Sequence, residues 1–223
     1  SRGLGDVYKR QLLASAYKAM PQQIFQLSVL SDDFCPSQHL NKDMSLQGLY
    51  NWREVEMTEL AGTLWAGYYA VIAEVNALLA RIDAVVTLDE TEKLEKMRIV
   101  CEAKALKSWC YFDLLRLFAP RYEGNENKDG IILKKRVELD FLPRSSVKEC
   151  VTEIRTLLNE ARNVDNTQKN VYWLSDKAVA YLQVELELYA GNYPAVLELT
   201  KDLETEYPES VLGADVYKYL WSS

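Results

Sequence analysis

Two long stretches in the first half of the sequence repeat apolar residues every three or four positions, and this period constrains the fold more than any other feature. From about Glu54 to Ile82, apolar and aromatic residues recur at the spacing of a helix with one wide buried face. The stretch from about Asp89 to Phe118 continues the period, and its second half is apolar almost all round. Such a helix must be covered by neighbours on several sides. The sequence therefore predicts an all-α fold of stacked helices with long loops.

Composition agrees with this fold and excludes one class of partner. The chain has 223 residues, of which 48% are hydrophobic, and nine glycines and six prolines leave long stretches for helices. The net charge is −7 at pH 7. An acidic chain has no electrostatic attraction to a polyphosphate backbone, so we expect no nucleic-acid partner.

Local signals place further helices in the second half. Ser145 and Ser146 precede Val147, and Glu149 completes a capping box with the second serine for a helix reaching about residue 161. Two more helices, at about 176–190 and 194–207, flank a Gly-Asn turn and form a hairpin that resembles one tetratricopeptide unit. Residues 31–51 and 120–143 are rich in turn-forming residues, and we expect two surface loops there, the second with a short extended run at 131–133.

The two ends of the sequence look unlike the rest. Residues 1–11, SRGLGDVYKRQ, carry no capping signal and resemble a translated adaptor, so we interpret them as a non-native leader. A short helix should run from Leu12 to Met20 and end at Pro21. Bulky residues close to Ser223 suggest that 12–223 is the N-terminal helical region of a longer protein, truncated at its C-terminal end.

Neither a metal site nor a membrane span is expected. The four cysteines, Cys35, Cys101, Cys110 and Cys150, form no C-x-x-C pair, and His39 is the single histidine. We interpret Cys101 and Cys110 as small buried apolar residues, and we expect no metal and no cofactor. No uninterrupted run of eighteen apolar residues occurs in the sequence, so the sequence predicts no membrane-spanning helix.

Several motifs resemble those of the SusD/RagB family of nutrient-binding proteins. The segment EAKALKSWCYFDLLRLF at 102–118 resembles a characteristic helix of that family, and RSSVKECVTEI at 144–154 resembles the start of a later one, with Cys150 and Val151 in place of the usual tyrosine. The short run after Gly130 has a counterpart in the family as well. A third group of residues has the same types and spacing as a pattern found in the family. Its members are Trp65, Tyr68 or Tyr69, Ile72, Asn76 and Leu79. The matching segments occur in the same order as in the family, and together they extend over nearly all of the chain after Gln11.

What the resemblance implies is a superhelix of tetratricopeptide-like units that binds glycans and is not an enzyme. Family members are attached to the outer membrane of Gram-negative bacteria through a lipidated cysteine, which is not visible in this sequence. They cover a SusC-type TonB-dependent transporter and deliver oligosaccharides, or for some members peptides, to it. The resemblance therefore predicts a carbohydrate ligand, a SusC-type partner and a location at the cell surface.

Candidate ligand contacts come from the loop before the first long helix. Glycan binding requires flat aromatic faces together with amides or carboxylates, and the predicted loop supplies Asp43, Tyr50, Asn51 and Trp52. We assign these four residues to ligand binding, by position and not by motif. We interpret the aromatic residues at helical spacing as packing residues of the core. These include Trp65, Trp109, Tyr111 and Phe112. Asn76 is interpreted as a buried hydrogen-bonding residue between helices.

Catalysis has little support in the sequence. A Ser-His-Asp arrangement depends on His39, and no nucleophile motif accompanies it. We therefore assign no catalytic residues, although an inverting glycosidase built from stacked helices is one alternative. The main alternative function is a generic tetratricopeptide scaffold that binds other proteins, but the 34-residue period of such scaffolds occurs only once.

Overall fold

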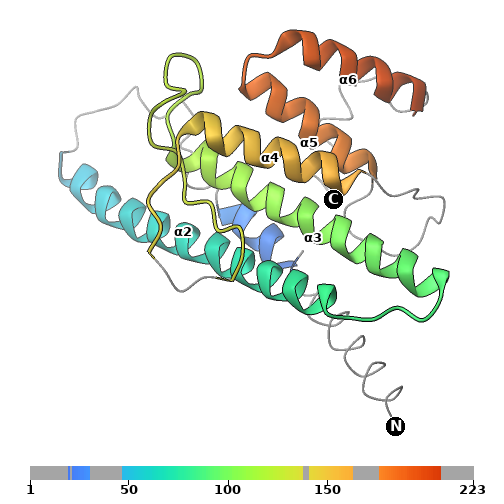
Figure 1. Ribbon diagram of the computed structural model, residues 1–223. Helices are drawn as coiled ribbons and strands as arrows, with labels where there is room; N and C mark the ends of the chain where they lie inside the picture. The colour runs from blue at the N-terminus through green and yellow to red at the C-terminus, as the bar shows by residue number, and fades with distance from the viewer. Residues whose placement is uncertain (1–19, 21, 31–46, 138–140, 163–175, 207–223) are drawn as a thin grey trace.

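The fold is taken from a computed structural model of the chain, which describes residues 20, 22–30, 47–137, 141–162 and 176–206. For residues 47–57 the backbone alone is described. Within these ranges the regular elements are helices, and the longest is α2. Their bounds are α2 Gln47–Asp83, α3 Glu90–Phe118, α4 Val147–Ala161, α5 Asp176–Tyr189 and α6 Tyr193–Glu206 (Figure 1).

Side-chain caps determine where two of these helices begin. The Asp89 side chain accepts a hydrogen bond from the Glu92 backbone N–H at 2.8 Å and starts α3. At the start of α4, the Ser146 side chain accepts from the Glu149 backbone, and the Glu149 carboxylate accepts from the Ser146 N–H at 2.8 Å. The predicted capping box is therefore confirmed, as are the bounds expected for α3 and α4.

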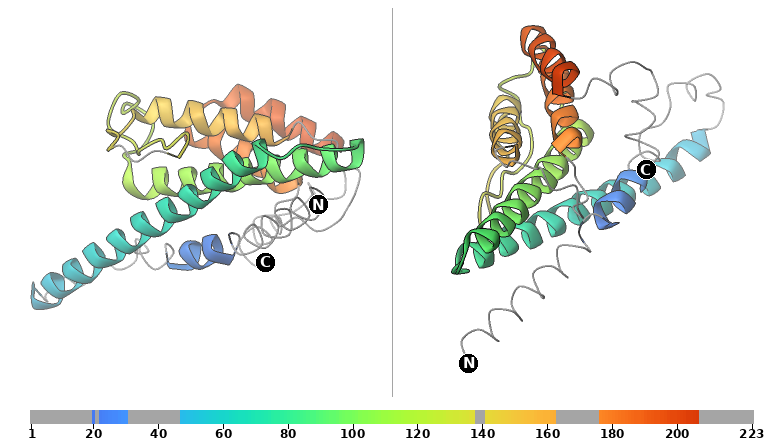
Figure 2. Two further views of the ribbon diagram at one scale, coloured as in Figure 1. Left: turned by 60° about the horizontal axis from the view of Figure 1, so that its bottom comes forward. Right: turned by 90° about the vertical axis from the view of Figure 1, so that its right-hand side faces the viewer.

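The α3 helix lies in the middle of the molecule, between α2 and α4 (Figures 1 and 2). Helix α5 packs on α4 and touches α3, and α6 packs on α5. Residues 22–30 are also helical and lie against α2. This arrangement explains why the second half of α3 is apolar almost all round, because neighbouring helices cover it on several sides.

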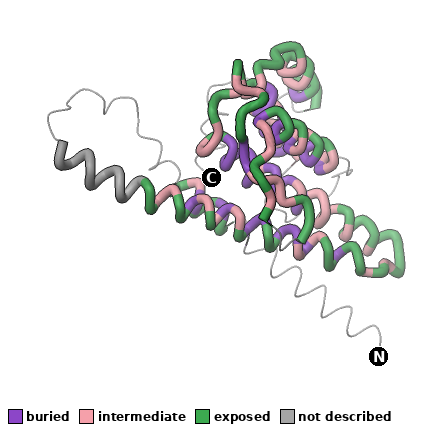
Figure 3. Tube along the Cα trace, turned by 60° about the vertical axis from the view of Figure 1, so that its left-hand side comes forward, coloured by how far each residue is buried: buried purple, intermediate pink, exposed green. Residues whose placement is uncertain are grey.

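The core is concentrated where α2, α3 and α4 face one another (Figure 3). Tyr68 and Asp113 form its main polar link, because the Tyr68 hydroxyl donates to the Asp113 carboxylate at 2.8 Å inside the core. Arg116 pairs with the same carboxylate at 2.7 Å. Full burial still raises the pKa of Asp113, although Arg116 opposes the shift. Outside this centre, α6 has a single buried residue, Leu203.

Residues 58–83 of α2 are long and apolar enough to cross a membrane when judged by length and composition alone, with a mean hydropathy of 1.2. Charged and polar residues interrupt its apolar run, so this stretch was not predicted from the sequence. Packing gives a direct reason for the hydropathy, because one face of this helix supplies the core with Leu64, Tyr68, Ile72, Val75, Leu78 and Ile82. A core helix meets the same criterion as a membrane span.

The predicted hairpin between α5 and α6 is confirmed. Gly191 has a φ of 67°, which lies in the left-handed region that a residue with a side chain rarely adopts. The Asn192 N–H donates to the Glu187 carbonyl at 2.9 Å and closes the last turn of α5. Across the helices, Arg155 of α4 binds Glu187 of α5 through two hydrogen bonds, of 2.5 and 3.1 Å.

Three expectations about loops need correction. The helix α2 begins at Gln47 and not near Glu54, so the end of the predicted 31–51 loop is helical. Helix also continues beyond Pro21, at residues 22–30, where Ile24 and Leu27 join the core. The 120–143 segment is not simply a surface loop, because Ile131 is fully buried. An isolated antiparallel bridge joins Asp129 to Ser146. At 131–133, where a short extended run was expected, the chain is neither helical nor part of a sheet.

Candidate functional site

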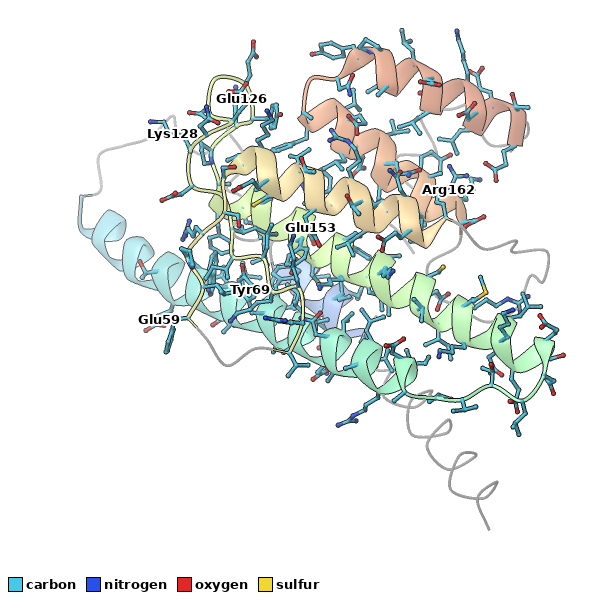
Figure 4. All side chains as sticks on the ribbon, viewed as in Figure 1. Glu59, Tyr69, Glu126, Lys128, Glu153 and Arg162 are labelled. Atoms are coloured by element: carbon cyan, nitrogen blue, oxygen red, sulfur yellow. The ribbon has the colours of Figure 1, made fainter. Side chains whose placement is uncertain are left out.

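Residues 130–136 form a strap that crosses α2 and α3 without belonging to a helix or a sheet. Tyr69 of α2 holds its middle, because the Tyr69 hydroxyl donates to the Ile132 carbonyl and accepts from the Ile132 N–H, each at 2.8 Å. Figure 4 labels Tyr69 where this segment passes α2. Burial raises the pKa of Tyr69 far above its usual range, so the hydroxyl keeps the proton that it donates.

Two more side chains bind the strap further along. Asn76 donates from Nδ2 to the Lys134 carbonyl at 2.9 Å and to the Arg136 carbonyl at 3.3 Å. The Tyr111 hydroxyl of α3 donates to the same Lys134 carbonyl at 2.8 Å. Asn76 is therefore a buried hydrogen-bonding residue, as predicted, but its partners lie on the strap and not on a neighbouring helix.

The first residues of the strap pack tightly against the start of α4. Gly130 donates its N–H to the Ser145 carbonyl at 2.7 Å, and a Cβ at Gly130 would lie 2.8 Å from the Cys150 Sγ. The Ile131 N–H donates to the same sulfur at 3.4 Å. A side chain larger than glycine therefore has no space at residue 130, and Cys150 is a buried packing residue whose pKa is raised by burial.

A pocket of about 330 Å³ lies between α2 and the strap. Trp65, Tyr69, Ala73 and Asn76 line it from one face of α2, where their spacing along the helix places them in a row. The opposite side comes from the strap and the residues that follow it. Those residues are Ile132, Lys134, Arg136, Val137, Phe141 and Leu142.

The pocket is mostly apolar, and one buried polar atom in it has no partner. Phe141 is fully exposed, with an exposed fraction of 104%, and Val137 is exposed to 62%. Asn76 is 4% exposed, and its Oδ1 has no hydrogen-bond partner within the described part of the chain. Because an unpaired buried carbonyl costs free energy, this acceptor calls for a donor from water or from a ligand.

Neighbouring side chains cover much of the Trp65 ring and leave little of it for contact with a ligand. The Arg144 guanidinium lies 4.9 Å from the Trp65 ring centroid, and Phe118 meets the ring edge-on at 5.1 Å. Tyr69 lies 4.9 Å away at a tilted angle. Trp65 therefore serves mainly in packing, as predicted, and it also lines the pocket.

The structure does not test the four ligand-binding residues predicted from sequence. Asp43 lies outside the described residues. Tyr50, Asn51 and Trp52 lie in the first turns of α2, where the backbone alone is described. The pocket was not predicted, although the spacing from Trp65 to Asn76 along one helix face was visible in the sequence. What the sequence did not show is that residues 132–137 and 141–142 lie against this face of α2.

Across the described ranges, no group of three or more His, Cys, Asp or Glu side chains is arranged to hold a metal ion. The pocket is lined by two cationic residues, Lys134 and Arg136, and by no acidic residue among its described members. The described lining therefore offers apolar contact and hydrogen-bonding groups.

Comparison with known proteins identifies a family. The model of a SusD-like family described as "Starch-binding associating with outer membrane" matches residues 6–185, which is more than half of the chain. Among curated proteins, no sequence matches.

Solved structures show the same fold. A SusD-like carbohydrate binding protein from Bacteroides vulgatus is similar with a TM-score of 0.60 and 20% identity over 72% of this chain. A SusD superfamily protein from Bacteroides thetaiotaomicron has a TM-score of 0.58 and 21% identity over 66%. A SusD-like protein from Bacteroides fragilis has a TM-score of 0.53 and 26% identity over 65%. The chain covers 33%, 32% and 27% of those three proteins, about a third of their length. The predicted all-α, tetratricopeptide-like architecture with long loops is confirmed.

Proposed function

Because the chain belongs to the SusD-like family, we propose that it binds oligo- or polysaccharides at the cell surface and delivers them to a SusC-type TonB-dependent transporter. The observation that carries this proposal is the match of the family model over residues 6–185. Under this proposal the chain binds its ligand without cleaving it, and the protein is held at the outer membrane of a Gram-negative bacterium by a lipid anchor.

The structure supports binding through its surface chemistry. The backbone of Tyr50, Asn51 and Trp52 lies in the first turns of α2, and a pocket lies further along the same helix. Rigid scaffolds that expose aromatic and amide groups are suited to sugars, whose C–H faces stack on rings and whose hydroxyls bind amides. We propose Asp43, Tyr50, Asn51 and Trp52 as ligand contacts. A generic tetratricopeptide scaffold has no separate observation in its favour.

Isothermal titration calorimetry of the 223-residue chain against a panel of oligosaccharides tests the binding step. The panel contains maltooligosaccharides, β-glucan oligosaccharides, and neutral and acidic galactose-based oligosaccharides. Trp52→Ala should weaken binding at least tenfold, whereas Tyr193→Ala, which truncates an exposed aromatic residue on α6, should leave it within twofold. Equal effects of the two variants would remove Trp52 from the site, and a panel without any binder would overturn the proposed function.

Two further measurements address catalysis and the partner. Chromatography of each bound glycan after prolonged incubation should show no shorter products, because the proposal assigns no catalytic residues. The tagged chain, purified from outer-membrane extracts of a bacterium that encodes it, should bring along a TonB-dependent transporter that mass spectrometry identifies. Release of shorter sugars would favour the glycosidase alternative, and recovery of the chain from the cytoplasm without a transporter would favour the scaffold.

A further inference from the structure

The turn between α2 and α3, residues 84–89, exposes two aliphatic side chains, Val86 and Leu88, which we call the apolar pair. Val86 is exposed to 75% and Leu88 to 79%, the two highest values among the described Val, Leu and Ile side chains. Figure 1 shows the turn at one end of the α2–α3 pair, away from the strap. Exposed apolar groups of this size are typical of a surface that another molecule covers.

Hydrogen bonds fix the backbone of this turn. The Glu92 carboxylate accepts from the Leu88 N–H at 2.8 Å, and the Asp89 side chain accepts from the Glu92 N–H at the same distance. The Lys96 ammonium donates to the Val85 carbonyl at 3.0 Å. The turn therefore presents the apolar pair on an ordered backbone, which lowers the entropy that a partner loses on binding it.

The start of α3 does not use the Leu88 side chain. Leu88 precedes the Asp89 cap, and an apolar residue at this position often packs against the fourth residue of the helix. In α3 the fourth residue is Lys93, whose ammonium pairs with the Glu90 carboxylate at 3.7 Å. The side chain of Leu88 is therefore left at the surface instead of being packed onto its own helix.

Charge indicates the kind of partner that fits. The charged residues nearest to the apolar pair in the sequence are Asp83, Asp89 and Glu90, and all three are acidic and exposed. Acidic groups around apolar side chains favour a partner whose apolar pocket has a cationic rim. They disfavour insertion into lipid, because carboxylates would lose their hydration there.

We propose that the apolar pair is a docking point for a protein that receives Val86 and Leu88 in an apolar pocket with a cationic rim. Under the proposed function, on which this inference rests, that protein is the TonB-dependent transporter. Trp52 and Asp83 are thirty-one residues apart on α2, roughly 45 Å along the helix axis. Contact at the turn is therefore separate from the residues proposed to bind the glycan, and the two can be measured independently.

Substitutions in the turn allow a matched test. The double substitution Val86→Asp and Leu88→Asp puts charges where the partner offers apolar contact. Leu197→Asp is the control, because Leu197 is an exposed aliphatic residue of α6. Asp83→Lys reverses an acidic charge at the C-terminal end of α2, where a lysine suits the helix dipole, so the substitution does not unfold the chain.

The substitutions are introduced into the tagged gene of a bacterium that encodes the chain, and mass spectrometry measures the transporter recovered with each variant from outer-membrane extracts. The double substitution should lower this recovery at least tenfold, and Asp83→Lys at least threefold. Leu197→Asp should change it less than twofold. A photoreactive benzoylphenylalanine in place of Leu88 should cross-link to the transporter. Calorimetry should give the same glycan affinity for all variants within twofold, and their Tm checks that the fold is retained.

Three outcomes would overturn the inference and leave glycan binding untouched. Undiminished recovery of the transporter with the double variant would show that the apolar pair is not its docking point. Increased recovery with Asp83→Lys would show that the partner's rim is acidic. Binding of the purified chain to phosphatidylethanolamine and phosphatidylglycerol vesicles, lost in the double variant, would assign the apolar pair to lipid. If the unsubstituted chain recovers no transporter, the partner named in the proposed function fails together with this inference.

Discussion

Replacing Glu102 by glutamine should stabilise the protein at neutral pH. Glu102 lies in the core-facing part of α3 and is 7% exposed, and burial raises its pKa from 4.5 to about 9. Between these two values the folded state binds a proton that the unfolded state has released, so stability falls as pH rises from 4.5 towards 9. Glutamine has nearly the same shape and does not titrate, so Glu102→Gln removes this loss.

The size of this stability difference follows from the number of pH units above 4.5, the pKa of the carboxyl in the unfolded chain. From 4.5 to 7, each pH unit contributes about 1.4 kcal/mol, which makes the accumulated difference about 3 kcal/mol at pH 7. At pH 5 the interval is short, and the same relation gives less than about 1 kcal/mol. The stability advantage of Glu102→Gln should therefore grow with pH, instead of being the same at every pH.

Urea unfolding followed by circular dichroism at pH 5, 6, 7 and 8 measures this growth. Glu95→Gln is the control, because Glu95 lies on the exposed side of the same helix, and its effect should stay within about 0.5 kcal/mol at each pH. Comparing each variant with the unsubstituted chain at the same pH cancels the titration of all other groups. A constant gap between pH 5 and pH 8 would refute the reasoning, because it would mean that the folded chain does not hold the proton on Glu102.

Three other substitutions test the strap and the helix contacts by the same unfolding assay. Gly130→Ala should destabilise the chain by about 1–3 kcal/mol, because its Cβ would meet the Cys150 sulfur at 2.8 Å, and an unchanged stability would show that the strap shifts freely. Tyr69→Phe should cost about 1–3 kcal/mol by leaving two strap backbone groups unpaired, a result that a loss below about 0.5 kcal/mol would contradict. Glu187→Ala should cost about 1.5–3 kcal/mol by removing both bonds from Arg155, and a neutral effect would show that α5 docks without this pair.

The helices were predictable because their signals are local. The period of apolar residues identified α3, and the Ser146–Glu149 capping box identified the start of α4. The start of α2 was missed because residues 47–53 include Gly48 and Asn51, which favour turns, so their helical state depends on continuation from the residues after them.

The pocket was not predictable, because it depends on contacts between residues far apart in the sequence. The Tyr69 hydroxyl and the Ile132 backbone are separated by 63 positions, and no local pattern relates them. Asn76 could be assigned as a buried hydrogen-bonding residue from its place on α2, but its partner could not. The same limit applies to Ile131, which was assigned to a loop because short apolar runs between turn residues are ambiguous.

The strap is held through backbone atoms, and this has a consequence for how such a surface diversifies. Tyr69, Asn76 and Tyr111 contact carbonyl and N–H groups that every residue at 132, 134 and 136 would supply, proline excepted for the N–H. These hydrogen bonds therefore do not depend on which side chains stand at the three strap positions. The sequence of the strap can therefore change at these positions while its backbone hydrogen bonds to the helical layer beneath stay the same.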